Sequence, residues 1–252
     1  MTILVTGATS GIGRATAFEF SKLQHSLIIT GRRADRLAET KEFLLQNGAS
    51  KVFTLCFDIR VLSQVKEAIK TLPADFFPID ILVNNAGLAS GLSTVQDGDV
   101  EDWEKMIDTN VKGLLYITRE IAPLMVKTGK GHIINVGSIA GKEVYANGNV
   151  YCATKHAVDA LSKGMRIDML PHGIKVTAVN PGMVETEFSI VRFHGDENRA
   201  KKVYEGLQPL KPEDIAETIV WCASRPAHVN INEVLIMPSA QANSTTSIRK
   251  TI

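Results

Sequence analysis

Short apolar runs recur along the chain, and most are followed by a longer stretch in which apolar residues return every three or four positions. The short runs have the length and the branched side chains of buried strands, whereas the longer stretches have the period of helices packed on one face. Strands are therefore predicted at 3–5, 26–30, 51–57, 79–83, 132–136, 175–179 and 233–237. Helices are predicted at 14–22, 34–46, 62–71, 100–125, 151–170 and 213–224.

This alternation of strands and helices predicts the α/β class with right-handed crossovers and a parallel sheet. We expect a doubly wound sheet of the Rossmann type, with helices on both faces and ligands bound beyond the carboxyl ends of the strands. Asn110 interrupts the long predicted helix at 100–125, where asparagine is mildly unfavourable, so we expect a bend or a special role there. A locally hydrogen-bonded side chain is the alternative.

Length and composition fit one domain over residues 1–240, followed by a polar tail at 241–252. The 252 residues are 44% hydrophobic and carry a formal net charge of +1, which favours neither nucleic acid nor an anionic membrane as partner. The chain has no apolar run of membrane-spanning length, and its apolar pattern begins at Ile3. We therefore expect no targeting peptide and a cytoplasmic protein.

Three scattered cysteines, Cys56, Cys152 and Cys222, cannot all pair, and this fits a reducing compartment. We expect each of them to be a small buried apolar residue. Cys152 adjoins Tyr151, where a thiol reagent would act beside the phenol, but nothing indicates a catalytic thiol. Neither the cysteines nor the six histidines have metal-ligand spacing, and no metal site is predicted.

A glycine-rich turn at 6–13 separates the first predicted strand from the first helix. Strand, glycine-rich turn and helix form the context that a dinucleotide-binding site requires. Gly7, Gly11 and Gly13 would let the backbone approach a pyrophosphate at the helix N-terminus. An ordinary strand-to-helix turn is the alternative for this motif taken alone.

Two arginines, Arg32 and Arg33, follow the second predicted strand. In NAD-binding proteins an acidic residue at about this place, roughly 20 residues after the glycines, contacts the ribose hydroxyl. A guanidinium binds a phosphate with two parallel hydrogen bonds, which a carboxylate would repel. We therefore predict NADP. Asp35 is the counter-argument, and we interpret it as a first-turn residue of the helix at 34–46. A solvated face is the alternative for the arginines.

Polar side chains stand at the carboxyl ends of several predicted strands, namely Thr6, Arg32, Asp58 and Asn85. Packing alone does not explain this placement. Because ligands bind at this edge of a parallel sheet, we expect these residues at the nucleotide, with Asp58 near the adenine.

Tyr151 and Lys155 lie four positions apart in a predicted helix, so their side chains share one face. A free tyrosine titrates near ~10, and a neighbouring ammonium would lower that pKa toward the working pH. Ser138, at the end of the fifth predicted strand, could hold a reacting oxygen by a hydrogen bond. The three residues thus predict an acid/base device for an alcohol or a carbonyl. A tyrosine and a lysine at this spacing also occur by chance on surface helices.

With the turn at 6–13, the segments 84–87 and 181–182, Asn110, Ser138, Tyr151 and Lys155 in this order and spacing, the chain resembles the short-chain dehydrogenase/reductase family over nearly its whole length. The resemblance implies a seven-stranded sheet and hydride transfer. It implies that Tyr151 is the acid/base, that Lys155 binds the nicotinamide ribose, that Ser138 polarises the substrate oxygen, and that Asn110 holds a water linking Lys155 to solvent. The cofactor-binding residues predicted on these grounds are Gly7, Thr9, Ser10, Gly11, Ile12, Gly13, Arg32, Arg33, Asp58, Ile59, Asn85, Ala86, Gly87, Tyr151, Lys155, Pro181, Gly182, Val184 and Thr186.

A narrower resemblance is to the NADP-dependent 3-hydroxy acid dehydrogenases, a group that includes serine 3-dehydrogenase and malonic semialdehyde reductase. The segments that carry it are 30–33, 101–104, 188–193, 195–196 and 226–232. It implies oxidation of the 3-hydroxyl of L-serine, L-allo-threonine or 3-hydroxypropionate, or the reverse reduction. The family also implies a homotetramer built through the last strand and the long helices.

The segment at about 185–207 lies between a strand and a helix and is expected to close over the substrate as a lid. It carries Arg192, which could hold the carboxylate of a hydroxy acid, so substrate contacts are predicted for Ser138, Tyr151 and Arg192. A surface arginine or an intersubunit ion pair is the alternative for Arg192. The tail at 241–252 could be loose or could strap a neighbouring subunit.

Two rival functions stay open. One is reduction of 3-oxoacyl groups on an acidic carrier protein, which would call for a basic docking surface and often a glycine-rich segment after the last strand. This chain has Met237, Pro238, Ser239 and Ala240 there, which weakens that reading. The other is an NADP-binding sensor or scaffold without catalysis. Such a protein should lack part of the set Ser138, Tyr151 and Lys155, and this chain retains all three.

Overall fold

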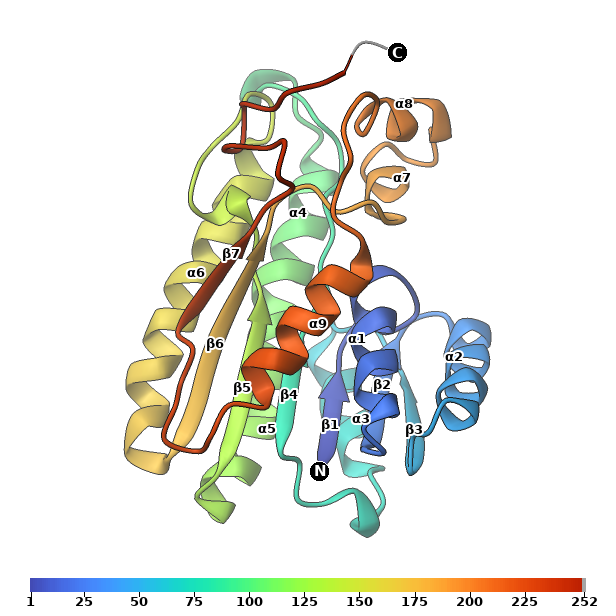
Figure 1. Ribbon diagram of the computed structural model, residues 1–252, viewed down its shortest axis with the longest axis vertical. Coiled ribbons are helices and arrows are strands. Elements are labelled where there is room, and N and C mark those ends of the chain that lie inside the picture. The colour runs from blue at the N-terminus through green and yellow to red at the C-terminus, as the bar shows by residue number, and fades with distance from the viewer. Residues whose placement is uncertain (251–252) are drawn as a thin grey trace.

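The computed structural model describes residues 1–250, and in this part of the chain seven parallel strands form one sheet in the order β3-β2-β1-β4-β5-β6-β7 (Figure 1). The strands are β1 Thr2–Val5, β2 Ser26–Gly31, β3 Lys51–Cys56, β4 Ile81–Asn84, β5 Gly131–Val136, β6 Ile174–Pro181 and β7 Glu233–Ile236. The direction of strand order reverses between β1 and β4, which opens a crevice at their carboxyl ends. The predicted doubly wound sheet is confirmed.

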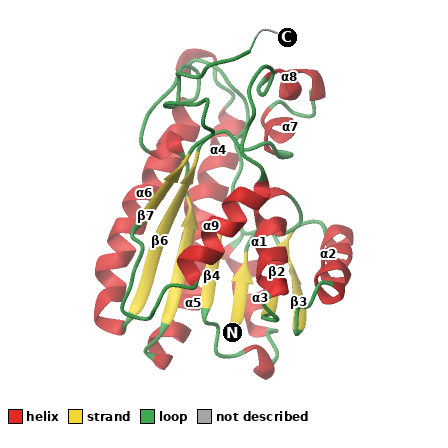
Figure 2. Ribbon diagram, viewed as in Figure 1, coloured by secondary structure: helices red, strands yellow, loops and turns green. Residues whose placement is uncertain are grey.

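Helices cover both faces of the sheet (Figure 2). One face carries α1 Gly11–Lys22, α2 Ala34–Gln46 and α9 Pro212–Ala223. The other carries α3 Leu62–Lys70, α5 Leu114–Thr128 and α6 Asn149–Met169, with α4 Val100–Ile107 preceding α5. In these residues no helix is long and apolar enough to cross a membrane.

The central strands are buried on both sides, which explains why they read as uninterrupted apolar runs. In β1, Ile3 and Val5 belong to the core under α1 and α9, whereas Leu4 belongs to the core under α3 and α5. All three are 0% exposed. Successive side chains of a strand point to opposite faces, so one short run supplies both cores.

The single helix predicted at 100–125 is divided in the structure. A π-helical segment, Asp108–Gly113, lies between α4 and α5 and contains Asn110, so the regular helix is interrupted at the residue where an irregularity is predicted. A π-turn inserts an extra residue into a helix and is frequent at functional sites. Smaller differences lie at element ends, since α1 begins at Gly11 and α6 at Asn149, both before the predicted starts.

One expectation about the cysteines is wrong. Cys152 and Cys222 are buried, but Cys56 is exposed. Cys56 is the last residue of β3, and β3 is an edge strand of the sheet. An edge strand is covered less completely than a central one, so the end of this strand stays open to solvent.

Two short helices, α7 Phe188–Arg192 and α8 Glu197–Lys202, lie beyond the carboxyl ends of the strands (Figure 1). They occupy the segment predicted as a lid. Two backbone hydrogen bonds close the base of this segment. Glu185 N donates to Leu210 O at 2.9 Å, and Leu210 N donates to Met183 O at 2.9 Å. This segment is therefore an excursion from the sheet edge that returns to its starting point, and it is called the lid segment, or lid, because a lid is its predicted role.

Candidate active site

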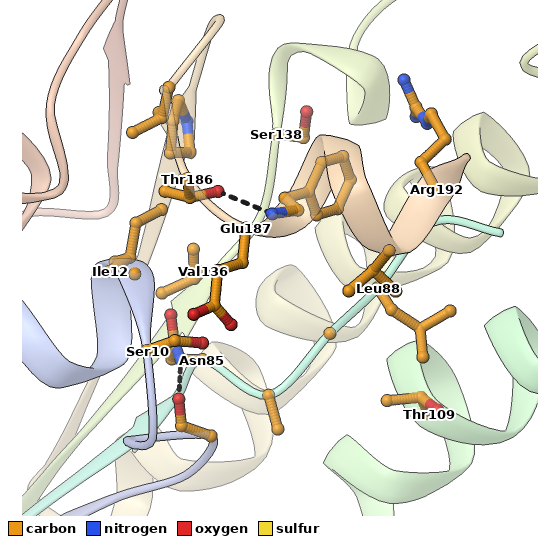
Figure 3. Close-up of a pocket in the computed structure, with 18 of the residues that line it drawn as sticks. Ser10, Ile12, Asn85, Leu88, Thr109, Val136, Ser138, Thr186, Glu187 and Arg192 are labelled. Atoms are coloured by element: carbon orange, nitrogen blue, oxygen red, sulfur yellow. Dashed lines mark hydrogen bonds between the residues drawn. The ribbon is translucent and has the colours of Figure 1, made fainter. Parts of the chain in front are cut away.

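A cavity of about 540 Å³ opens at the carboxyl edge of the sheet and extends under the lid (Figure 3). Its walls come from the turn after β1, the ends of β2 to β6 and the segment 184–204. The predicted site residues that line it are Gly7, Thr9, Ser10, Gly11, Ile12, Arg32, Arg33, Asp58, Ile59, Asn85, Ala86, Gly87, Ser138, Tyr151, Lys155, Pro181, Gly182, Val184, Thr186 and Arg192. Gly13 and Asn110 stand behind the cavity wall.

The glycine-rich turn is shaped by close approaches that only glycine permits. Gly7 and Gly11 have φ of +68° and +51°, in the left-handed region. A Cβ atom on Gly13 would lie 2.4 Å from both the Gly7 carbonyl oxygen and Asn85 Nδ2. Asn85 Nδ2 donates to the carbonyls of Thr6 at 2.9 Å and Gly7 at 3.2 Å, so β4 braces the turn. Ser10, Gly11 and Ile12 at the N-terminus of α1 line the cavity, and Ser10 makes no side-chain cap, so free backbone N–H groups there can receive an anion.

The two arginines after β2 reach the same end of the cavity. Arg33 Nη2 donates to Thr9 Oγ1 at 2.8 Å and to Ser10 Oγ at 3.0 Å, while its Nη1 lies 3.1 Å from Glu187 of the lid. Arg32 is more exposed and lies 3.9 Å from Asp58. Asp35 stands in the first turn of α2, as predicted. Two guanidinium groups with no competing carboxylate from β2 can receive a phosphate.

Asp58 is held by Arg60, a residue that the sequence did not single out. Arg60 Nη2 donates to Asp58 Oδ2 at 2.6 Å, and Arg60 Nε reaches both carboxylate oxygens. The hydrogen bonds from Arg60 lower the pKa of Asp58 from its usual range. Asp58 therefore stays ionised and fixed at the end of β3.

Ser138, Tyr151 and Lys155 converge at the other end of the cavity. Ser138 follows β5, and its Oγ accepts from the backbone N–H of Ala140 at 3.0 Å. Lys155 is 7% exposed, and its Nζ donates to the carbonyl of Val136 at 3.0 Å. Burial lowers the pKa of Lys155 to about 8.

The expected lowering of the Tyr151 pKa by Lys155 is wrong for this arrangement. Burial raises the pKa of Tyr151, and so does Tyr145, while Arg192 and Ser138 act in the opposite direction. The Lys155 ammonium is directed to the Val136 carbonyl, and the guanidinium of Arg192 lies 4.9 Å from the Tyr151 ring. The phenol is therefore kept protonated, and the cation that acts on its pKa is Arg192 of the segment 185–207.

Asn110 joins three segments at the back of the site. It is 2% exposed, its Oδ1 accepts from Leu88 N at 2.8 Å, and its Nδ2 donates to Leu88 O at 2.8 Å and to Thr154 Oγ1 at 3.0 Å. These partners are distant in sequence, so the alternative of a locally bonded side chain is wrong. A Cβ atom on Gly87 would lie 3.2 Å from Asn110 Oδ1 and 3.6 Å from Lys155 Nζ. The π-helical segment thus brings this amide beside the lysine.

Arg192, the last residue of α7, points into the end of the cavity that holds Ser138 and Tyr151 rather than to the surface. Its Nη2 donates to Tyr145 Oη at 2.7 Å, and its guanidinium lies 5.1 Å from the Phe188 ring. Within residues 1–250 its Nε is buried without a hydrogen-bond partner. Figure 3 shows Arg192 and Ser138 at one end of the pocket and Ser10 and Asn85 at the other. The structure thus offers an unsatisfied donor beside the phenol of Tyr151.

Several lining residues had no signal in the sequence. Leu88, Tyr145, Met183, Glu187, Gln241 and Ser244 reach the cavity from separate segments. Gln241 Oε1 accepts from Met183 N at 2.9 Å, and Arg249 donates to the carbonyls of Val203 and Glu205. Residues 241–250 therefore pack on the lid of their own chain, while 251–252 lie outside the described residues. Only a contact map could have found these residues.

Comparison with known proteins points to one family. A family model described as short chain dehydrogenase matches residues 1–196. An NADP-dependent 3-hydroxy acid dehydrogenase from Salmonella typhi is 48% identical over 251 residues, covering 99% of this chain and 100% of that protein. A protein of the same name from Schizosaccharomyces pombe is 43% identical over 250 residues, covering 99% of this chain and 96% of that protein.

Solved structures agree with the sequence relatives. The closed form of a serine dehydrogenase complexed with NADP+ superposes with a TM-score of 0.93 at 45% identity, covering 100% of both chains. A serine dehydrogenase from Escherichia coli superposes with a TM-score of 0.83 at 42% identity, covering 96% of this chain and 100% of that chain. The similarity extends over the lid as well as the sheet.

Proposed function

The chain belongs to the short-chain dehydrogenase family, and from this membership and the cavity's geometry we propose that it is an NADP-dependent dehydrogenase of small 3-hydroxy acids. The substrates we propose are L-serine, L-allo-threonine and 3-hydroxypropionate, with malonic semialdehyde in the direction of reduction. The observation that carries the substrate class is the unpartnered Nε of Arg192 in the same cavity as Ser138 and Tyr151. A buried guanidinium donor suits a carboxylate that a neutral alcohol would lack.

The cavity residues fit NADP. Gly7, Ser10 and Gly11 would hold the pyrophosphate at the N-terminus of α1, and Arg32 and Arg33 would hold the 2′-phosphate. Asp58 and Ile59 would contact the adenine, and Asn85, Pro181, Gly182 and Thr186 would line the part of the cavity between the pyrophosphate and Tyr151. Bound there, NADP supplies the acceptor for a hydride from the substrate carbon.

Side chains of the protein would exchange a proton with the substrate and orient it. Ser138 would donate a hydrogen bond to the substrate oxygen, and Tyr151 would exchange a proton with that oxygen. Burial keeps the phenol protonated, ready to donate to a carbonyl in the direction of reduction. Asn110 would position Lys155 and the loop at Leu88, and closure of the lid would exclude water.

The decisive experiment follows reduced-nicotinamide absorbance with NADP and a substrate panel. The panel holds L-serine, L-allo-threonine, 3-hydroxypropionate and an uncharged secondary alcohol, together with a 3-oxoacyl thioester tested in reverse. Preference for the hydroxy acids is expected. Turnover of the thioester alone would favour the carrier-protein reductase, and tight NADP binding without any turnover would favour a sensor or scaffold.

Replacement of Arg192 by alanine separates a carboxylate clamp from a surface arginine. Loss of a charge-assisted hydrogen bond costs about 1.5–3 kcal/mol, so the KM for L-serine should rise about 10- to 100-fold. The kcat/KM for the uncharged alcohol should stay within about twofold of the unsubstituted protein. Arg192→Lys keeps the positive charge but loses the planar guanidinium. Its KM for L-serine should therefore lie between those of the unsubstituted protein and Arg192→Ala. Equal losses for both substrates would remove the clamp.

We also propose a cytoplasmic homotetramer of a single domain, residues 1–240, whose lid spans about 185–207. The edge strand β7 leaves Leu235 at 49% exposure, and α6 and the turn after it leave Ile167 and Leu170 at 73% and 75%. Exposed apolar residues on an open edge and a long helix suit burial against further copies. Light scattering of the purified protein would measure the assembly, and a monomer would contradict it.

A further inference from the structure

Asp102, on α4, carries a carboxylate that is buried outside the set of residues assigned to the reaction. The residue is 5% exposed. Its Oδ1 accepts from Ser90 Oγ at 2.6 Å and lies 3.8 Å from Lys105 Nζ, and its Oδ2 lies 3.2 Å from His194 Nε2 in the lid. Burying a carboxylate is unfavourable unless its oxygens are satisfied. This one is satisfied in part by a residue from the lid.

His194 meets that carboxylate in an unusual backbone conformation. Its φ is +54°, and Gly195 after it has φ of +92°. A left-handed conformation is uncommon for a residue with a side chain and persists where surrounding contacts hold it. The His194 side chain is 58% exposed, whereas the Asp102 side chain is 6% exposed. The lid thus reaches down to a fixed anion in the body of the protein.

The same junction fixes the backbone of the proposed substrate clamp. Gly91 N donates to the carbonyl of Arg192 at 2.9 Å, two residues before His194. A Cβ atom on Gly91 would lie 2.6 Å from Asp102 Oδ2, so glycine is needed for the carboxylate to fit under the lid. Ser90, Gly91 and Asp102 therefore form one seat for the end of α7.

We propose that Asp102 and His194 are positioning residues that seat the end of α7 and thereby set the Arg192 guanidinium in the substrate pocket. This inference rests on the proposed function, in which Arg192 receives the substrate carboxylate. It predicts a defect confined to substrates that carry a carboxylate. An error of about 1 Å in a positioned group can cost up to ~100-fold in rate, so a tenfold effect is a reasonable size.

The lead variant is His194→Ala, because an exposed side chain can be removed without unfolding the chain. The KM for L-serine should rise about tenfold, with kcat/KM for an uncharged secondary alcohol and the Kd for NADP unchanged. His194→Gln, whose amide nitrogen can take the place of Nε2, should restore most of the loss. Asp102→Asn should show the same split between substrates. His228→Ala, at an exposed position between α9 and β7, is the matched control and should change nothing.

Combining His194→Ala with Arg192→Ala separates this inference from the proposed function. In the Arg192→Ala background the histidine change should add no further rise in KM, because both act through one guanidinium. Additive effects, equal losses for both substrates in His194→Ala, or no effect of His194→Ala would overturn the positioning role alone. Absence of a selective effect in Arg192→Ala, or no hydroxy-acid turnover by the unsubstituted protein, would overturn the clamp and the positioning role together.

Discussion

The two ends of the cavity are built in different ways. At the nucleotide end, the residues follow directly from strands, and their backbones are set by the sheet and by glycine turns such as that at Gly7 and Gly11. At the substrate end, Arg192 comes from a five-residue helix and is fixed by contacts with segments near residues 91 and 145. The nucleotide end therefore depends on local chain geometry, and the substrate end on long-range contacts that a single substitution can loosen.

Replacing Tyr151 with phenylalanine should have the largest effect on the chemistry, because it removes the proton donor while leaving the ring that packs against Phe188. Loss of general acid/base catalysis typically lowers rates by about 10²–10⁴-fold, and kcat should fall within that range. The Kd for NADP, measured by fluorescence titration, should stay unchanged. Retained turnover would show that the phenol is not the acid/base.

A pair of apolar substitutions compares how much α1, which packs on the sheet, and α7, in the lid segment, contribute to the free energy of unfolding. Phe20 on α1 is 1% exposed, and Phe20→Ala should lower the free energy of unfolding by about 3–5 kcal/mol. Ile190 on α7 is 37% exposed, and Ile190→Ala should change it by less than about 0.5 kcal/mol. Denaturant titration measures both. Comparable losses would mean that the lid folds as part of the core.

Arg33 tests whether the nucleotide end of the cavity selects NADP over NAD through a contact with the 2′-phosphate. Arg33→Ala should weaken NADP binding by about 10- to 100-fold, since it removes a charge-assisted bond of about 1.5–3 kcal/mol. NAD binding should not change. Arg36 lies 3.8 Å from Glu187 and is not a predicted phosphate ligand, so Arg36→Ala is the control. Parallel losses for NADP and NAD in Arg33→Ala would assign the arginine to the fold instead.

Lys155 should lower the free energy of unfolding, because its charge is buried in the candidate active site. Its pKa falls from 10.5 to about 8 because burial disfavours the charged form. Between these values the unfolded chain binds more protons than the folded one, so stability rises with pH; the penalty is complete below pH 8 and absent above 10.5. Lys155→Met should therefore stabilise the protein at pH 7, by about 1–3 kcal/mol, and less as pH rises. Thermal unfolding across that interval measures this, and a pH-independent gain would contradict it.

The sequence alone determined the sheet, the glycine turn and the positions of Ser138, Tyr151 and Lys155. These features depend on side-chain period, strand ends and helical spacing, all of which are local properties of the chain. It also indicated the irregularity at Asn110, because an asparagine interrupts an otherwise regular helical pattern.

The tertiary structure alone decided how the substrate end is assembled. It turned Lys155 toward the Val136 carbonyl, raised the pKa of Tyr151 by burial, and brought Arg192 over the phenol. It also seated His194 on Asp102 and folded the tail at 241–250 over its own lid. The physical reason is that burial and contacts between distant segments depend on the closed chain as a whole, and no local period in the sequence records them.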